Sequence, residues 1–304
     1  MKRALALFFA LMMLFSTALA EDAVVTESAE EEEEFTDTTG FTPIPWDAEV
    51  MPYAPHEECY LPDNAGYHDD SLDIRIETFR RDDTTVMAIY VTVADASQIR
   101  TGIAGTWRNK RTAPVSQTLQ KYGGVLGING DYYTYHSQGI VVRNTEQIRF
   151  NPVAGRETLI IDENGDFTIL SPTTKEAFNN FEGTVVHAFC FGPGLVIDGE
   201  PLTDLSTVTM DNGKGKKTQR MAIGQLGHLS YLILTCEGPE NEGSVGFDLL
   251  QMAALCKELG CINAYNLDGG SSSTVAMRGE KINATSSNKV RSVSDIIFFA
   301  TLVP

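Results

Sequence analysis

Basic residues are scarce in this sequence. It contains 23 lysines and arginines against 41 aspartates and glutamates, which gives a formal net charge of −18 over 304 residues. A nucleic-acid-binding protein needs a positively charged surface that neutralises phosphates. The composition therefore argues against nucleic acid as a partner, although a local group of arginines can still bind a small anionic substrate.

Long apolar runs are also scarce. The one near the N-terminus, Ala4–Phe15, follows two basic residues and ends close to the small residues Ala18 and Ala20. It is shorter than the roughly 20 residues that a membrane-spanning helix needs. A charged start, a short apolar run and small residues are typical of a secretory signal peptide, with an uncleaved anchor as the alternative. We predict a signal peptide over residues 1–20 and a secreted or cell-envelope protein without stable membrane insertion.

Cysteines and histidines number only five each and do not occur at metal-ligand spacings. The sequence therefore predicts no metal site and no required cofactor. A divalent cation held by loop carboxylates is compatible with the sequence but not indicated, because oxygen ligands have no diagnostic spacing. Cys190 and Cys236 lie in apolar, strand-like runs and are expected to be buried free thiols.

The N-terminal part of the mature chain lacks the apolar residues that a core requires. Nine of the twenty residues 21–40 are acidic, including the run Glu30–Glu34, so we expect a self-repelling, disordered spacer. Residues 41–70 carry five prolines and are expected to wrap over the domain in extended form. These two segments form a linker over 21–70, and a single domain follows over 71–304.

The rest of the chain alternates between strand and helix patterns. Apolar residues at every second position predict strands, as at Leu72, Ile74 and Ile76. A short helix is expected after Pro114, ending at a glycine pair, and a longer one over Phe247–Leu259. Strands outnumber helices throughout.

Two strand ends share an unusual polar design. In Ala264–Thr274 (AYNLDGGSSST), Asn266 and Asp268 lie on one strand face, and a glycine pair and four hydroxyl residues follow. Asn129 and Asp131 repeat the spacing after another apolar strand. One interpretation is a pair of Asp–Gly turns whose hydroxyls satisfy loop backbone. The other is that the two ends converge on one polar site.

Five ordered sequence blocks carry a family resemblance. They are NGDYY at 129–133, FGPGLV at 191–196, RMAIG at 220–224, NLDGGSSST at 266–274 and RSVSDI at 291–296. Together they resemble the phosphodiester glycosidase family, whose bacterial members are often linked to exopolysaccharide. The resemblance implies an α+β domain with a central mixed β-sheet flanked by a few helices. It also implies hydrolysis of the glycosidic C–O bond in a sugar-1-phosphodiester, such as one of N-acetylglucosamine, within a glycan.

Candidate site residues follow from these blocks and from the chemistry. Glycosidic cleavage needs carboxylates near the anomeric carbon, and phosphate needs arginines and backbone amides. The expected catalytic residues are Asp131, Asp268 and Glu237. The expected substrate- and phosphate-binding residues are Asn129, Gly130, Arg143, Arg220, Asn266, Gly269, Gly270, Ser272, Ser273 and Arg291.

The chain departs from the family pattern at two places. Ser271 stands where the family usually has a third glycine, and Glu237-Gly238-Pro239 replaces an Asp-Gly-Arg or Asp-Gly-Gln segment. Two alternatives to the family activity therefore stay open. One is a noncatalytic carbohydrate-binding protein of the cell envelope, and the other is an ordinary glycosidase or phosphodiesterase on the same fold.

Overall fold

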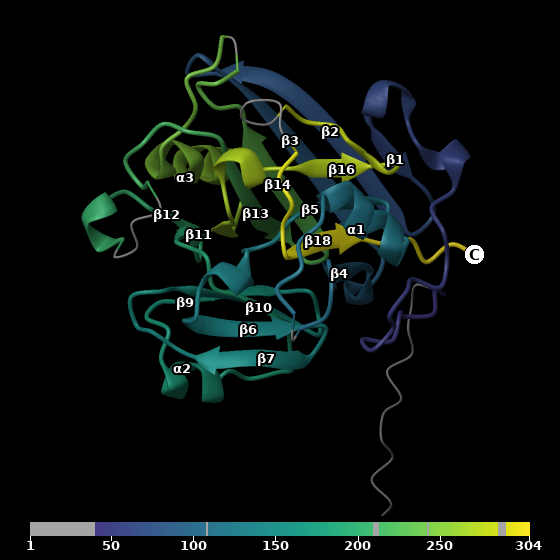
Figure 1. Cartoon of the computed structure of the whole chain (residues 1–304), viewed down its shortest axis with the longest axis horizontal. Helices are drawn as coiled ribbons and strands as arrows, with labels where there is room; N and C mark the ends of the chain where they lie inside the picture. The colour runs from purple at the N-terminus through teal and green to yellow at the C-terminus, as the bar shows by residue number, and fades with distance from the viewer. Residues whose placement is uncertain (1–39, 108, 209–212, 242, 285–289) are drawn as a thin grey trace, which may run out of the picture. The chain divides into compact units, whose positions relative to one another are not determined.

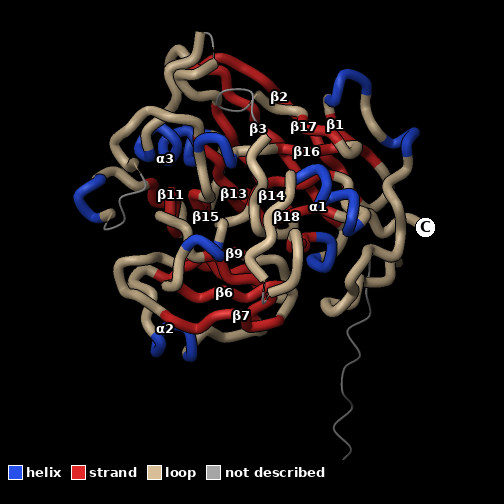
Figure 2. Tube along the Cα trace, viewed as in Figure 1, coloured by secondary structure: helices blue, strands red, loops and turns tan. Residues whose placement is uncertain are grey.

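The computed structural model describes residues 40–107, 109–208, 213–241, 243–284 and 290–304. The predicted signal peptide and the acidic spacer up to residue 39 lie outside the described residues. The predicted α+β domain, made mainly of strands with a few helices, is confirmed, and its strands are distributed over three sheets (Figures 1 and 2).

The largest sheet has eight strands in the order β1-β2-β3-β14-β13-β15-β11-β12. Their bounds are β1 Gly66–His68, β2 Leu72–Arg81, β3 Thr84–Val93, β14 Ser230–Cys236, β13 Arg220–Gly227, β15 Asn263–Asn266, β11 Gly194–Ile197 and β12 Glu200–Pro201. Its strands pair antiparallel. The sharp turn between β2 and β3 places Asp82 and Asp83 at φ 45° and 55°, left-handed conformations that aspartate tolerates.

Two five-stranded sheets complete the domain. The sheet called here the β6 sheet has the order β7-β6-β10-β8-β9, with bounds Glu146–Asn151, Gly139–Arg143, Val185–Phe189, Thr158–Asp162 and Phe167–Leu170. The sheet called here the β5 sheet has the order β17-β16-β5-β18-β4, with bounds Glu280–Lys281, Val275–Met277, Leu126–Asn129, Asp295–Phe299 and Ile99–Ile103. Both are antiparallel as well.

Three α-helices accompany the sheets in the described part of the chain: α1 Val115–Tyr122, α2 Lys175–Asn179 and α3 Leu249–Glu258. Helix α1 begins after Pro114 and ends at Gly123 with φ 76°, as predicted from the sequence. Helix α3 begins with a capping box in which the Asp248 and Gln251 side chains each bind the other residue's backbone amide. Local sequence thus specifies both ends of α1 and the start of α3.

One hydrophobic core joins the three sheets. It includes Ile89 of β3, Ile128 of β5 and Ile161 of β8, which are all fully buried. Helix α3 packs on the eight-stranded sheet, where Leu249 belongs to a second cluster. Helix α1 packs on the β5 sheet through Leu119 in a third. Because all three sheets contribute to one core, loops from different sheets are held at fixed relative positions.

The proline-rich segment packs against the domain, but the prediction that it stays extended without elements of its own is wrong: it forms short 3-10 helices at Glu57–Cys59 and Pro62–Asn64, and its residues Gly66–His68 pair with β2 as strand β1. Ile44 and Met51 are buried in the cluster that holds α1. The fully buried Arg100 donates hydrogen bonds to the backbone carbonyls of Pro45 and Trp46, at 3.1 and 2.9 Å. Burial lowers the pKa of Arg100 to about 10. The segment is therefore attached by both apolar contacts and carbonyl hydrogen bonds.

In the part of the chain that the structure describes, no helix combines the length and the apolar character that a membrane crossing requires. The five cysteines are all free, and both Cys190 and Cys236 are buried, as predicted.

Candidate functional site

The two Asn-x-Asp strand ends meet, although they belong to different sheets. Strand β5 ends at Asn129, and β15 ends two residues before Asp268. The Nδ2 atom of Asn129 donates a 2.9 Å hydrogen bond to the carbonyl of Asp268, and its Oδ1 accepts one from the amide of Thr274 at 3.1 Å. The two loops therefore meet, and Asn129 joins them.

The second asparagine, Asn266, holds a third loop. Its Nδ2 donates to the carbonyl of Gly192 at 2.8 Å, and its backbone amide donates to the carbonyl of Pro193 at 3.0 Å. Its side chain is fully buried, and its Oδ1 has no hydrogen-bond partner among the described residues. Both motif asparagines thus position backbone and are not exposed to substrate.

Gly130 allows the end of β5 to approach β18 closely. Its amide donates to the carbonyl of Asp295 at 2.9 Å, and a Cβ built on it would lie 2.2 Å from the Oδ2 atom of Asp295. Any other residue would displace that carboxylate. The glycine of the NGD block is therefore needed for packing at this junction.

Asp131 lies in a buried ionic cluster. Nη2 of Arg143 donates to Oδ1 of Asp131 at 2.7 Å and to Oδ2 of Asp295 at 3.0 Å, and all three side chains have no solvent exposure. The amide of Cys190 donates to Oδ2 of Asp131 at 2.8 Å. Burial raises the pKa of Asp295 to about 6; Arg143 opposes the rise and Asp131 adds to it. Neither Asp131 nor Arg143 is exposed to a substrate in this arrangement.

A cavity of about 350 Å³ lies where the loops meet. That volume falls in the range of about 300–1,000 Å³ that is usual for small-molecule sites. Its lining includes four aromatic side chains, one carboxylate and two arginines. The lining residues are Tyr132, Tyr135, His136, Phe191, Thr218, Arg220, Asp268, Gly269, Gly270 and Arg291.

Asp268 is the carboxylate of this cavity. Burial raises the pKa of Asp268; hydrogen bonding with the Ser272 side chain and, after it, the charge of Arg291 oppose the rise. Its Oδ2 is buried and has no hydrogen-bond partner among the described residues. A carboxylate oxygen left without a protein donor is unusual, because buried polar atoms are nearly always satisfied. Asp268 therefore combines a perturbed pKa with open hydrogen-bonding capacity at a cavity.

The two arginines of the cavity have different surroundings. The guanidinium of Arg220 is mostly buried and donates to the backbone carbonyls of Gly213, Lys216 and Phe247, at 2.6, 2.9 and 3.1 Å. Arg291 is exposed, and its Cζ lies 5.3 Å from the centroid of the Tyr132 ring. Arg220 thus holds the loops of the site together, whereas Arg291 presents its charge at the surface of the cavity.

The glycine pair allows the chain after Asp268 to pass close to β13. A Cβ on Gly269 would lie 2.9 Å from the carbonyl oxygen of Gln219. Gly270 has φ +61°, and its amide donates to the same carbonyl at 2.9 Å. The Gly270 amide is thus engaged within the protein. Ser272 and Ser273 are fully buried, and the Ser272 side chain lowers the pKa of Asp268 by hydrogen bonding.

Glu237 lines a different pocket from Asp268, one of about 250 Å³ that Thr85 and Thr235 also line. Its Oε2 accepts a 2.6 Å hydrogen bond from the hydroxyl of Ser244. It is not among the residues that line the cavity of Asp268. The family resemblance suggested Glu237 as a catalytic carboxylate, in place of the aspartate of an Asp-Gly-Arg or Asp-Gly-Gln segment, but the loop after β14 carries it into the other pocket.

The tyrosine and phenylalanine lining is the part of the site that the sequence reasoning missed. The rings of Tyr132 and Tyr135 are stacked at 5.7 Å, and Tyr135 is highly exposed. His136 packs edge-on against Tyr135 at 5.1 Å and against Phe191 at 6.4 Å. Burial lowers the pKa of His136, which favours its neutral form. The sequence feature that could have predicted an aromatic lining is the pair Tyr132-Tyr133, which directly follows Asp131.

Among the described residues, no group of three or more histidine, cysteine, aspartate or glutamate side chains is placed to hold a metal ion.

The sequence matches a protein-family model and one curated relative. The family model described as phosphodiester glycosidase matches residues 122–300. A curated relative, the SPbeta prophage-derived uncharacterized protein YomE of Bacillus subtilis (strain 168), is 32% identical over 143 residues, which is 47% of this chain. The matched part spans 22% of that relative's length.

Two solved structures share the fold. The catalytic domain of zebrafish N-acetylglucosamine-1-phosphodiester alpha-N-acetylglucosaminidase, auto-inhibited by its pro-peptide, aligns with a TM-score of 0.62 at 17% identity. That alignment covers 87% of this chain and 99% of the other. A Synechocystis protein aligns with a TM-score of 0.53 at 14% identity, covering 75% and 62% of the two chains. At these identities the likeness establishes the fold alone.

Proposed function

The chain belongs to the phosphodiester glycosidase family, and on that premise we propose that it is a hydrolase that cleaves the glycosidic C–O bond of a sugar-1-phosphodiester. The products would be the free sugar and a phosphomonoester on the other partner. The proposed substrate is a phosphodiester-linked glycan of the cell envelope or an exopolysaccharide. The zebrafish enzyme that shares the fold acts on an N-acetylglucosamine-1-phosphodiester, which supports a sugar of this class.

One observation carries the proposal: Asp268 and Arg291 line the same cavity. A sugar-1-phosphodiester carries one negative charge, next to a carbon that becomes positively charged when the bond breaks. An arginine suits the phosphate, because its planar guanidinium donates paired hydrogen bonds to two oxygens. A carboxylate suits the anomeric carbon. The cavity thus offers opposite charges for the two halves of the reacting group.

The roles that we propose follow from these positions. Asp268 in its charged form stabilises the oxocarbenium-like transition state and accepts a proton from the attacking water. Arg291 binds the phosphate that leaves. The stacked rings of Tyr132 and Tyr135 provide an apolar face for the sugar ring. A second carboxylate as general acid is not needed, because the leaving group is a phosphomonoester, a weakly basic anion.

Asp131 and Arg143 enter the proposal as positioning residues. They fix the chain that carries Tyr132, and Asn129 fixes the backbone of Asp268 from the same loop. Arg220 holds the loops around the glycine pair, and Asn266 holds the segment that contains Phe191. Glu237 has no role in the proposed reaction.

Hydrolysis in ¹⁸O-labelled water tests the reaction directly. Several sugar-1-phosphodiesters would be incubated with the mature chain, and the products analysed by mass spectrometry. Cleavage of the C–O bond places the label in the sugar, as we expect. Label in the phosphate would instead identify a phosphodiesterase that cleaves the P–O bond. The Asp268→Asn variant serves as the control for contaminating hydrolases.

A noncatalytic carbohydrate-binding protein is the second candidate, and one observation favours it. Glycosidases usually place two carboxylates at the scissile bond, and Asp268 is the one carboxylate among the described residues that line this cavity. Saturable sugar binding without turnover on any sugar-1-phosphodiester would support this candidate. Turnover that disappears in Asp268→Asn would rule it out.

We also propose that the protein is exported. The support is the sequence pattern of residues 1–20. N-terminal sequencing of secreted material should find a mature end near Glu21, and secreted protein that begins at Met1 would contradict this cleavage.

A further inference from the structure

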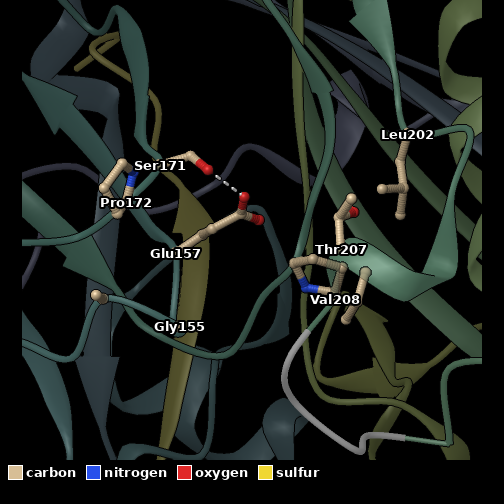
Figure 3. A pocket seen from close by; sticks show the side chains of 9 residues that line it. Gly155, Glu157, Ser171, Pro172, Leu202, Thr207 and Val208 are labelled. Carbon is tan, nitrogen blue, oxygen red and sulfur yellow. Dashed lines mark hydrogen bonds between the residues drawn. The ribbon is translucent and has the colours of Figure 1, made fainter.

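A second pocket is built around Glu157 (Figure 3). Its volume is about 210 Å³. The Glu157 side chain projects into it, with Ser171 and Pro172 on one side and Thr207 and Val208 on the other. Nothing in the proposed reaction uses this pocket.

The Glu157 carboxylate is held in place by two neutral donors. Its Oε1 accepts a 2.6 Å hydrogen bond from the hydroxyl of Ser171, and its Oε2 accepts one of 2.6 Å from the amide of Gly194 (Figure 3). No ion pair joins it to a cation in the part of the chain that the structure describes. Each carboxylate oxygen can accept more than one hydrogen bond, so both keep capacity for a ligand.

The pocket and the candidate site lie on either side of one short segment. Phe191 lines the cavity of Asp268, and Pro193 lines the pocket of Glu157. Asn266 fixes the residues between them through the carbonyls of Gly192 and Pro193. The same strand end that leads to Asp268 therefore sets the position of the second pocket.

We propose that the Glu157 pocket binds a second sugar ring of the substrate glycan through two adjacent hydroxyl groups. This inference rests on the proposed function in that it takes the substrate to be a glycan. Two neighbouring hydroxyls match a carboxylate that is fixed in orientation and accepts on both oxygens. The aliphatic side chains of Leu202 and Val208 provide an apolar wall for the carbon face of the ring.

The charge and the size of the Glu157 pocket restrict which ligands it can bind. An unpaired carboxylate repels phosphate and other anions, and this chain is already strongly acidic, with a net charge of −18. The pocket volume of about 210 Å³ lies below the range of about 300–1,000 Å³ that is usual for sites of drug-sized ligands. That is room for one sugar ring and not for a longer oligosaccharide. The pocket therefore favours a single neutral hexose unit.

Direct binding tests this without any turnover. The mature chain, labelled with ¹³C at methyl groups, would be titrated with the methyl glycosides of glucose, mannose, galactose and N-acetylglucosamine. We expect at least one to shift the methyl resonances of Leu202 and Val208 with a millimolar dissociation constant. The Glu157→Gln variant keeps the shape and a donor–acceptor pair but loses the charge, so binding should weaken about tenfold or more.

Two further variants make the result specific. Glu200→Gln removes an exposed carboxylate on β12 and should bind like the unaltered protein. Thr207→Trp fills the pocket from an exposed position and should abolish binding even if Glu157→Gln fails to fold. Equal binding by all variants, or shifts confined to the aromatic residues of the Asp268 cavity, would overturn the proposal.

Kinetics separate this inference from the proposed function. If the protein hydrolyses sugar-1-phosphodiesters, KM should be lower for a substrate with a second hexose than for one without it. The ratio of the two KM values should approach one in Glu157→Gln. If the unaltered protein turns over both substrates with the same KM, the inference is wrong, but the proposed function still stands. Sugar binding at Leu202 and Val208 without turnover would sink the proposed function alone.

Discussion

The side chain of Asn129 donates a 2.9 Å hydrogen bond to the backbone carbonyl of Asp268, across 139 residues of sequence and between two sheets. Asn129 is fully buried at the end of β5. Because both sheets contribute to one core, the bond fixes the chain at Asp268 relative to the loop of Tyr132. The carboxylate and the aromatic lining of the cavity are thus held in one arrangement.

Replacing Asp268 should abolish turnover and leave the fold intact. Asp268→Asn removes a charge that the transition state requires, and losing such stabilisation costs about 10²-fold or more in rate. The change is nearly isosteric, so thermal melting should stay cooperative and within a few degrees. Asp70→Asn, at an exposed position, is the matched control and should retain full turnover. Normal turnover in Asp268→Asn would remove this residue from the site.

Replacing Arg143, in contrast, should lower the stability of the fold, because Arg143 belongs to the buried ionic cluster. Arg143→Gln leaves the carboxylates of Asp131 and Asp295 buried without their cation. Removing one partner of a buried ionic group typically costs about 3–5 kcal/mol of unfolding free energy. Denaturant unfolding at pH 7 measures this loss, with the exposed Arg111→Gln as the control. A loss below about 1 kcal/mol, the value typical of surface pairs, would contradict the structural role.

Asp295 should make stability depend on pH between about 4 and 6. Its pKa is about 6 in the folded protein and about 3.9 in an unfolded chain. A raised folded pKa means that the native state binds the proton more tightly. The stabilisation is therefore complete below the unfolded pKa and is lost as pH rises through the folded pKa. The difference in unfolding free energy between the unaltered protein and Asp295→Asn should shift across this window, and a constant difference would refute the assignment.

Arg291 should control the acid limb of the pH–rate profile. The charged form of Asp268 is the active one in the proposal, and kcat/KM reports the pKa of the free enzyme. Burial raises that pKa, so the acid limb should lie above the value of an ordinary aspartate, 3.8. Arg291 favours the carboxylate, and Arg291→Gln should therefore move the limb to higher pH.

The same variant should raise KM, because the phosphate loses a charged donor worth about 1.5–3 kcal/mol. Arg291→Lys should recover the pH profile, since it keeps the charge, but only part of the KM, since it lacks the planar fork. An unchanged acid limb in Arg291→Gln would show that the arginine does not act on Asp268.

Local sequence determined much of the secondary structure. Alternating apolar residues specified strands such as β2 and β3, and proline and glycine specified both ends of α1. The paired Asn-x-Asp ends also allowed the interpretation that two distant loops converge on one polar site; the loops meet through the Asn129 bond, but of the two aspartates Asp268 alone lines the cavity. These features depend on periodicity and on backbone preferences, which are properties of neighbouring residues and can be read from the chain directly.

Only the tertiary structure decided which charged residues face the cavity. Asp131 and Asp268 have the same local pattern, yet Asp131 is buried against Arg143 and Asp268 lines the cavity. Alternation gives the face of a strand on which a side chain lies, but not what packs against that face. The second partner of Arg143, Asp295, is 152 residues away in sequence. Such pairings arise from how the three sheets pack, because burial of a charge depends on the elements that cover it.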